Sequence, residues 1–327
     1  MMQVSVCREQ SPHAPVMLPE VLEALCPQEG EVYVDGTFGA GGYTRGILNS
    51  ADCKVYAIDR DPGAKERGAK IEEEYKGRFT FMRGCFGDVA ALLEKEGRGQ
   101  VDGFVLDLGV SSMQLDEADR GFSFRFDGPL DMRMDSAGDG ETAADIVNTY
   151  EEGPLADLIY RYGEERCSRR VAKKIVARRA VQKFKTTLDL ADVIREAVPR
   201  SPKDKNDPAT RTFQALRIAV NDELGELERA LEASIHILKP GGRLVVVSFH
   251  SLEDGLVKSF MREKSGAAPA ASRHMPMGAQ SFAPALFEQK MRRAVKPSDG
   301  EVRINARARS ARLRVAVRTN ASVKGVA

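Results

Sequence analysis

Short runs of β-branched and aromatic residues recur at intervals of roughly 25 residues in the first third of the chain. Each run is bounded by Gly, Pro or charged residues, which is typical of strands buried inside a sheet. Apolar residues spaced three and four apart predict short helices around these runs. The strands predicted in this way are residues 32–35, 54–59, 78–82 and 101–109, and the helices are residues 19–25, 43–48 and 90–96. The alternation predicts a parallel sheet connected by right-handed crossovers.

The alternation stops after the fourth predicted strand. Residues 114–206 contain no convincing strand pattern. Within them, residues 121–134 predict a loop, and most of the remainder has a helical pattern. We therefore interpret residues 114–206 as a mostly helical insertion. Residues 1–113 and 207–327 are then the two parts of one sheet domain.

A helix is expected where the sheet pattern resumes. Asp207 and Pro208 form a good cap and first-turn pair. Apolar residues then recur at steps of three and four over residues 213–238, the pattern of a long helix lying on a sheet. Gly225 is expected to interrupt or bend this helix.

Two more strands are predicted near the end of the chain. A glycine-containing turn at residues 239–243 leads into an apolar run at 244–249. Apolar and polar residues alternate over residues 312–317, which predicts a half-exposed antiparallel strand at one edge. The expected fold is therefore an α/β protein with a doubly wound sheet and a helical insertion after strand four.

Composition and charge narrow the class of protein. The chain of 327 residues is 42% hydrophobic and 30% charged, and its formal net charge of +1 indicates neither a nucleic-acid nor a membrane partner. Its five cysteines are scattered and never form a C-x-x-C pair, which favours reduced thiols over a zinc site or a disulfide frame. Residues 1–11 lack the apolar core of a signal peptide, and no apolar run reaches membrane-spanning length. These features predict a soluble cytoplasmic protein.

Four glycines follow the first predicted strand within residues 36–42. Glycine permits the sharp turn and the close backbone approach that a nucleotide-like ligand requires. The spacing does not match the dinucleotide fingerprint, and the chain has no phosphate-binding loop motif. Asp35 precedes the loop, which itself contains no basic residue. This combination suits a cationic ligand without a pyrophosphate, such as S-adenosylmethionine, although glycine clusters are also common in plain turns.

Acidic residues end three of the predicted strands. Asp35, Asp59 and Asp107 occupy these positions, and Phe86 follows the third strand. The carboxyl ends of parallel strands meet at one edge, where such folds bind their ligands. Asp59 lies 24 residues after Asp35, near the spacing of a carboxylate that binds a ribose diol. A helix-capping role is the alternative there, and Asp61 can serve as the cap.

Basic residues are concentrated in two segments. Residues 161–185 contain ten Lys or Arg and two acidic residues, and the chain from residue 284 onward contains eleven and three. Such clusters suggest contacts with RNA phosphates, although a solvated surface is the alternative for any single member. Three phenylalanines could stack on an extruded base or pack the insertion. The candidate RNA face is Arg166, Arg169, Arg170, Lys173 and Lys174, and the phenylalanines are Phe122, Phe124 and Phe126.

Hydrolase and metal chemistry are not indicated. The four histidines include no H-E-x-x-H motif and no defensible Ser-His-Asp arrangement. We therefore expect no metal site. His250 is expected to form hydrogen bonds within the turn that follows the fifth strand.

Several segments resemble one protein family along nearly the whole chain. The turn at residues 238–244 resembles the class I S-adenosylmethionine-dependent methyltransferases. The full set is similar to the bacterial small-subunit rRNA cytosine-N4 methyltransferase family. The matching segments are residues 13–18, 35–42, 57–61, 107–112, 120–134, 162–166, 208–215, 248–254 and 305–314.

This resemblance implies a function and a set of site residues. It implies methyl transfer from S-adenosylmethionine to the exocyclic amine of cytosine 1402 of 16S rRNA, in the small ribosomal subunit. Asp107 is implied to fix the cofactor, with a possible catalytic part in orienting the amine. The chain departs from the family at Tyr43, where His is common, and at Gly255, where a basic residue is common. The implied cofactor contacts are Gly41, Gly42, Tyr43, Asp59, Phe86, Asp107 and Gln114.

Other functions stay open at this stage. A related methyltransferase could act on a protein or a small molecule, although the basic insertion speaks against that. A non-catalytic RNA-binding assembly factor would be expected to lose the loop glycines or the strand-end acids, and both are present. The glycine spacing argues against a nicotinamide dehydrogenase. The sequence does not determine the oligomeric state, and a homodimer is one option.

Overall fold

The strands form one seven-stranded sheet. The computed structural model describes residues 15–200, 206–266 and 284–322, so the N-terminal segment judged not to be a signal peptide lies outside the described residues. The sheet order is β3-β2-β1-β4-β5-β7-β6, in which β1 to β5 pair in parallel and β7 is antiparallel to both neighbours. The predicted fold class is confirmed. The strands are β1 (Val32–Asp35), β2 (Lys54–Asp59), β3 (Phe79–Arg83), β4 (Val101–Asp107), β5 (Leu238–Ser248), β6 (Phe287–Gln289) and β7 (Arg312–Arg318).

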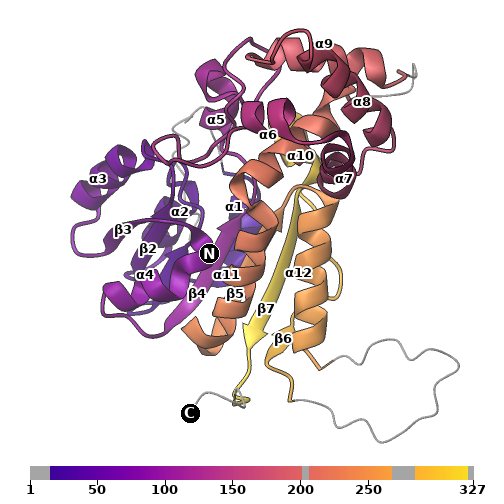
Figure 1. The fold of residues 1–327 in the computed structure, drawn as a ribbon. Coiled ribbons are helices and arrows are strands. Elements are labelled where there is room, and N and C mark those ends of the chain that lie inside the picture. The colour runs from indigo at the N-terminus through magenta and orange to yellow at the C-terminus, as the bar shows by residue number, and fades with distance from the viewer. Residues whose placement is uncertain (1–14, 201–205, 267–283, 323–327) are drawn as a thin grey trace, which may run out of the picture.

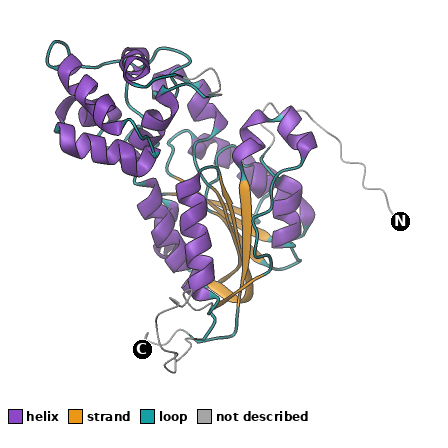
Figure 2. Ribbon diagram, turned by 90° about the vertical axis from the view of Figure 1, so that its right-hand side faces the viewer, coloured by secondary structure: helices purple, strands orange, loops and turns teal. Residues whose placement is uncertain are grey.

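Helices cover both faces of the sheet (Figure 2). Successive strand residues point to opposite faces, so Tyr33 packs in one hydrophobic cluster and Val34 in the other. This is why the strands read as continuous apolar runs. One face carries α4 (Val89–Lys95), α11 (Glu223–Ile237) and α12 (Ser251–Lys264), and the other carries α1 (Leu18–Leu25), α2 (Gly42–Ser50) and α3 (Ala64–Glu74).

A second group of helices has its own hydrophobic core. It receives residues from the loop at 121–134, among them Phe122 and Leu130. Figure 1 shows these helices grouped beyond one end of the sheet. Leading to them are α5 (Ser112–Asp116) and the short helix η2 (Ala118–Arg120). The group consists of α6 (Ala143–Thr149), α7 (Glu152–Gly163), α8 (Ser168–Arg179), α9 (Thr187–Ala197) and α10 (Ala209–Asn221).

The prediction of one long helix over residues 213–238 is wrong in one respect. The helix divides at Asp222, whose φ of 48° lies in the left-handed region, and α10 packs with the helical group instead of the sheet. Gly225, the predicted break, lies inside α11. A Cβ at Gly225 would come within 2.4 Å of the Asp222 carboxylate, so the glycine makes room for the break three residues earlier.

Two further predictions about strands need correction. The turn at residues 239–243 is contained in β5, because the pairing with β4 jumps from Val101↔Leu238 to Gly103↔Arg243. The intervening residues bulge out of the ladder. Strand β7 is antiparallel as predicted, but it is not at the edge, since β6 pairs along its outer side. A strand of three residues carries too little pattern to be predicted.

The segment before β7 folds back toward the carboxyl ends of the parallel strands. It contains α13 (Asp299–Ile304) and the short helix η3 (Ala306–Ser310). The Glu301 carboxylate accepts a hydrogen bond from the Met17 backbone N–H at 2.7 Å, which ties the segment to the start of α1. No helix in the three described ranges is long and apolar enough to cross a bilayer.

Candidate active site

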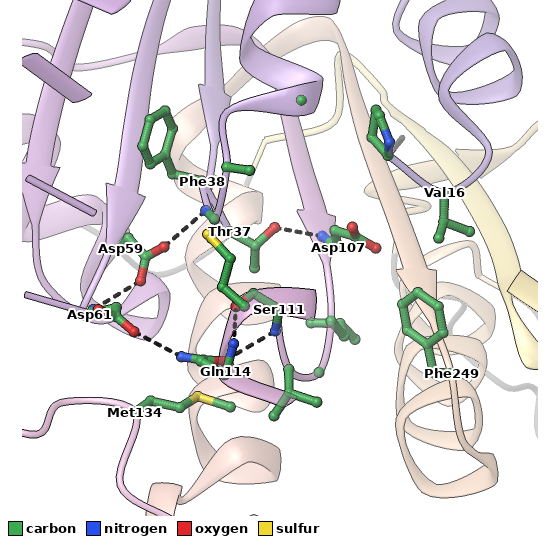
Figure 3. Close-up of a pocket in the computed structure, with 18 of the residues that line it drawn as sticks. Val16, Thr37, Phe38, Asp59, Asp61, Asp107, Ser111, Gln114, Met134 and Phe249 are labelled. Atoms are coloured by element: carbon green, nitrogen blue, oxygen red, sulfur yellow. Dashed lines mark hydrogen bonds between the residues drawn. The ribbon is translucent and has the colours of Figure 1, made fainter. Parts of the chain in front are cut away.

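A cavity of about 420 Å³ opens at the carboxyl ends of β1, β2, β4 and β5 (Figure 3). Its lining combines the glycine loop, the residues after β2 and β4, helices α5 and α10, and the segment before β7. The volume is that of a small-molecule site. The cavity lies at the edge of the sheet where the strand-end acids predicted a ligand.

Hydrogen bonds to the Asp35 carboxylate hold the glycine loop in place. Asp35 is buried, and its carboxylate accepts hydrogen bonds from the Thr44 hydroxyl at 2.7 Å and the Thr37 N–H at 3.2 Å. Burial raises the pKa of Asp35 to about 6. Asp35 itself does not line the cavity, although Gly36 and Thr37, which follow it, do. It supports the loop instead.

The three loop residues predicted to contact the cofactor differ in whether they line the cavity. Gly42 and Tyr43 line the cavity, whereas Gly41 does not. Gly41 has a φ of 80°, and a Cβ there would lie 2.4 Å from Ile71, so this glycine permits the turn and its packing. The Tyr43 hydroxyl donates to the Val16 carbonyl at 2.6 Å, which engages the phenol within the protein.

Asp59 lines the cavity, and both of its carboxylate oxygens are held by backbone N–H groups (Figure 3). One oxygen accepts from the Gly39 N–H and the other from the Asp61 N–H, each at 2.9 Å. Burial raises the pKa of Asp59. Each oxygen retains a lone pair, so the side chain can accept two further hydrogen bonds from a ligand.

Gln114 lines the cavity, but its amide is engaged by the protein. Its oxygen accepts from the Ser111 N–H at 3.0 Å, and the Ser111 hydroxyl accepts from the Gln114 N–H at 3.2 Å, which together cap α5. Its Nε2 donates to the Asp61 carboxylate at 3.1 Å. Asp61 also accepts from the Gly63 N–H in the turn before α3. The predicted cap is wrong, because α3 begins at Ala64 with Gly63 as its N-cap and no side chain caps it. Phe86 completes this half of the lining with an aromatic face.

Asp107 has a buried oxygen that lacks a hydrogen-bond partner among the described residues. Its backbone N–H donates to the Thr37 hydroxyl at 2.6 Å, which fixes the strand end against the glycine loop. Burial, together with the negative charges of Asp35 and Glu253, raises the pKa of Asp107 well above its usual range. A buried acceptor without a partner is costly, so this oxygen is suited to a donor or a positive charge brought by a ligand.

The far half of the lining contains residues that the sequence interpretation missed. Gln214 and Arg217 face the cavity from α10, beside Phe249. The Arg217 guanidinium forms a two-pronged ion pair with Glu223, with Nε at 2.7 Å and Nη2 at 2.8 Å. Its Nη1 has no partner among the described residues and remains able to donate.

A local signal for these residues was present. Gln214, Arg217 and Asn221 are spaced three and four apart, so they share one face of α10. A polar face inside a buried helix indicates either a site or an internal network. Asn221 belongs to the second kind, because its amide donates to the Met132 carbonyl and accepts from the Met134 N–H.

His250 forms hydrogen bonds within the turn after β5, as predicted. Its Nδ1 accepts from the Glu253 N–H at 3.4 Å, which caps α12. Glu223, His250 and Glu253 lie close enough together to suggest a cation site. However, Arg217 occupies the Glu223 carboxylate, and one Glu253 oxygen accepts from the Phe249 and His250 N–H groups. The cluster is therefore a buried ion-pair network.

The predicted RNA face consists of Arg166, just before α8, and four cations on α8; we call it the α8 face, and it is largely paired with the protein. None of its five cations lines the cavity. Arg166 and Lys173 are exposed and have no ion pair with a described residue. The other three have partners: Arg169 pairs with Asp157 at 2.6 Å, Lys174 with Glu196 at 3.5 Å, and Arg170 donates to the Ala197 carbonyl.

The three phenylalanines of the loop have different surroundings. Phe122 is buried in the core of the helical group, and Phe124 packs edge-on against Phe213 at 4.9 Å. The packing interpretation therefore holds for these two. Phe126 is 60% exposed, and its ring remains available to a partner.

Comparison with known proteins agrees with this geometry. The chain matches the profile of the MraW methylase family over residues 10–319. Ribosomal RNA small subunit methyltransferase H of Rhodospirillum rubrum is 61% identical over 312 residues, 94% of this chain and 95% of that protein. The protein of the same name from Paramagnetospirillum magneticum is 58% identical over 310 residues, 95% of this chain and 96% of that protein.

A comparison of folds with solved structures gives matches of low sequence identity. An rRNA methylase from Streptococcus thermophilus is 10% identical, with a TM-score of 0.41 over 93% of this chain and 94% of that one, and it adds nothing to what the sheet order already shows. The family match and the two relatives each cover nearly the whole chain. The chain belongs to the MraW methylase family and is an S-adenosylmethionine-dependent methyltransferase.

Proposed function

We propose that this enzyme methylates the exocyclic N4 amine of a cytosine in 16S rRNA, namely cytosine 1402 in the decoding centre of the small ribosomal subunit. The names of the relatives, which specify small-subunit ribosomal RNA, support the RNA substrate. In this proposal residues 114–206 form an RNA-recognition insertion, and the enzyme acts in the cytoplasm, where ribosomal subunits are found.

The residues around the glycine loop fit S-adenosylmethionine. Asp59 has two free lone pairs for the ribose hydroxyls, and Phe86 offers an apolar wall to the adenine. The backbone at Gly42 and Tyr43 borders the same space. The bound cofactor supplies an electrophilic methyl group on a sulfonium. Its positive charge would be favoured close to the Asp59 and Asp107 carboxyl groups, which line the cavity.

The acceptor half of the cavity carries the observation on which the cytosine proposal depends. Asp107 has an oxygen without a partner, and Arg217 has an Nη1 without one, in the lining of one cavity. Cytosine presents N–H donors at N4 and acceptors at N3 and O2. Asp107 can accept from the amine while Arg217 donates to the ring acceptors. Uracil presents an acceptor and a donor at the first two positions, so the same pair would disfavour it.

These side chains would act mainly by orientation. The lone pair of the cytosine amine is delocalised into the ring, which makes the amine a poor nucleophile. An acceptor at Asp107 Oδ1 would favour the pyramidal amine and receive its proton. Arg217, fixed by Glu223, would hold the base so that N4 approaches in line. Phe249 borders the same space and can exclude water from it.

Transfer of labelled methyl groups tests this proposal. Purified enzyme would be incubated with labelled S-adenosylmethionine and with small subunits, free 16S rRNA, ribosomal proteins or metabolites. Label is expected in the RNA, and mass spectrometry of nuclease fragments should locate it at N4 of one cytosine. Label on another base, on protein or on a metabolite would overturn the proposal. Binding to subunits without transfer would indicate a non-catalytic assembly factor.

The α8 face keeps a secondary place in this proposal. Arg166 and Lys173 can reach RNA without losing an ion pair to a described residue. Arg169 and Lys174 would first have to leave Asp157 and Glu196. An outer RNA contact is therefore proposed for α8.

A further inference from the structure

Basic residues are concentrated where the segment before β7 reaches the cavity. Asn305 and Arg307 belong to the cavity lining, and Arg307 also pairs with Asp116 at 2.9 Å. Val295 forms a bridge with Leu313 in β7, which brings the start of the segment to the same end of the sheet. We call the basic side chains of this segment the basic rim: Arg292, Arg293, Lys296, Arg303, Arg307 and Arg309.

The basic rim is exposed, and its charge is mostly uncompensated. All six side chains are exposed, and five of them have no ion pair with a described residue. The acidic residues of the same segment are Asp299 and Glu301, and Glu301 is engaged by the Met17 N–H. This differs from the predicted RNA face at α8, where three of its five cations bond to groups of the protein.

The rim is also held in a defined place. Ala308 inside η3 and Ala311 directly after it are buried in the core cluster on one face of the sheet, which anchors η3. Ile304 is 81% exposed beside Arg303. An apolar side chain next to exposed cations suits a nucleotide, which offers a base or sugar face beside a phosphate.

We propose that the basic rim binds the phosphate backbone of the RNA strand that flanks the target nucleotide. This inference rests on the proposed function, because it assumes that an RNA base enters the cavity. A base taken out of its stack drags its neighbouring phosphates to the mouth of the pocket. Cations at that mouth fix the position of the strand without reading its sequence. The charge of the rim and its place at the cavity favour RNA over a protein or a second copy of this chain.

Two matched double variants test the rim against α8. The rim variant is Arg303→Gln with Arg309→Gln, and the α8 variant is Arg166→Gln with Lys173→Gln. Each removes two exposed cations that have no ion pair with a described residue. Binding to transcribed 16S rRNA and to isolated small subunits would be measured at several salt concentrations, and S-adenosylmethionine affinity by calorimetry.

The rim variant should bind RNA about tenfold more weakly at low salt, and its plot of log affinity against log salt should flatten by about 1.5. Its KM for subunits should rise while kcat and cofactor affinity stay unchanged. The α8 variant should show a clearly smaller change. Equal flattening in both variants, flattening in α8 alone, or no change in either would overturn the proposal.

A third variant separates charge from fold. If the rim variant also loses cofactor affinity, the double variant Arg303→Lys with Arg309→Lys would show whether the lost RNA binding results from lost charge or from a damaged fold. Restored salt dependence in that variant supports phosphate binding, and its absence contradicts it. The two proposals also fail separately. If RNA binding depends on the rim but no cytosine is methylated, only the proposed function is rejected. If methylation is normal and the rim variant binds RNA like the wild type, only this inference is rejected.

Discussion

Arg120 donates from Nη1 to the Asp61 carboxylate at 2.8 Å, which joins the start of the helical insertion to the loop after β2. The two side chains are only 16% and 8% exposed. Nη2 of the same guanidinium donates to the Met134 carbonyl at 2.9 Å, and Met134 lines the cavity. One arginine therefore connects three parts of the cavity wall.

Replacement of Arg120 should destabilise the enzyme. Arg120→Ala leaves the Asp61 carboxylate buried without its charge partner, at an expected cost of about 3 kcal/mol in the free energy of unfolding. Arg169→Ala is the control, because its ion pair with Asp157 is 69% exposed on both sides and should contribute less than about 1 kcal/mol. Urea unfolding would compare the two. Equal losses in both variants would contradict the assigned importance of the Arg120 pair.

The same pair predicts a dependence on acid. Burial alone would raise the pKa of Asp61, but Arg120 and the Gly63 N–H lower it below its usual range. A carboxyl with a lowered folded pKa contributes stability at neutral pH that is lost as pH falls below about 4. Denaturation curves measured between about pH 6 and about pH 3 should show this loss of stability in the wild type. The loss should be much smaller in Arg120→Ala.

Asp107→Asn should impair both cofactor binding and turnover. The substitution removes the negative charge and places an amide where an acceptor is required, so turnover should fall by about 10²- to 10⁴-fold. Calorimetry would measure cofactor affinity, and single-turnover kinetics would measure methyl transfer. Asp119→Asn, at an exposed position on η2, is the control and should behave like the wild type. Unchanged affinity together with unchanged turnover would refute both roles of Asp107.

The pH profile provides an independent test of Asp107. Because burial raises the pKa of Asp107, the acceptor form of the free enzyme is lost as pH falls through that raised value. The kcat/KM of the wild type should therefore decline on the acidic side, beginning above the range of an ordinary carboxyl. Asp107→Asn should lack this acidic decline in kcat/KM. If the decline persists in the variant, it arises from the titration of another group.

Gly41→Ala should be more harmful than an alanine at another glycine with positive φ. A Cβ at Gly41 would come within 2.4 Å of Ile71 and 3.0 Å of Phe38. Backbone strain and overpacking together should cost about 2–4 kcal/mol and weaken cofactor binding, because the loop borders the cavity. Gly30→Ala shares the positive φ but has open space around the added methyl, so about 1 kcal/mol is expected. Similar losses in urea unfolding would exclude the steric explanation.

Arg217→Lys should separate base positioning from cofactor binding. Lysine keeps the charge but loses the planar fork that pairs with Glu223 and the free Nη1. The kcat/KM for small subunits should fall by about 10- to 100-fold. Cofactor affinity should not change. The control is Arg229→Lys on α11, because Arg229 is half-exposed, pairs with Asp222 and Glu226 and does not line the cavity. Loss of cofactor affinity in Arg217→Lys would mean that Arg217 contacts the cofactor and not the base.

Much of this architecture was predictable from local pattern. Strand identity depends on short-range features, namely apolar runs bounded by turn residues, and these features predicted a parallel sheet and its ligand-binding edge. The acidic residues at the strand ends could also be identified as site candidates from the sequence, because a charged residue directly after a buried strand is costly unless it has a structural or functional role. Asp59 and Asp107 do line the cavity. The fold class and the general position of the site follow from this information.

The orientation and pairing of single side chains depended on contacts between distant segments. Asp35 looked equivalent to the other two acids, yet Thr44, on the following helix, holds it beneath the loop. The exposed charge of α8 looked like an RNA face, but acidic residues on neighbouring helices pair with Arg169 and Lys174. Arg217 lines the cavity from α10, which ends at Asn221 and packs with the helical group instead of continuing along the sheet. Local pattern records which residues alternate, whereas hydrogen bonds and ion pairs between elements determine which side chains remain free to meet a ligand.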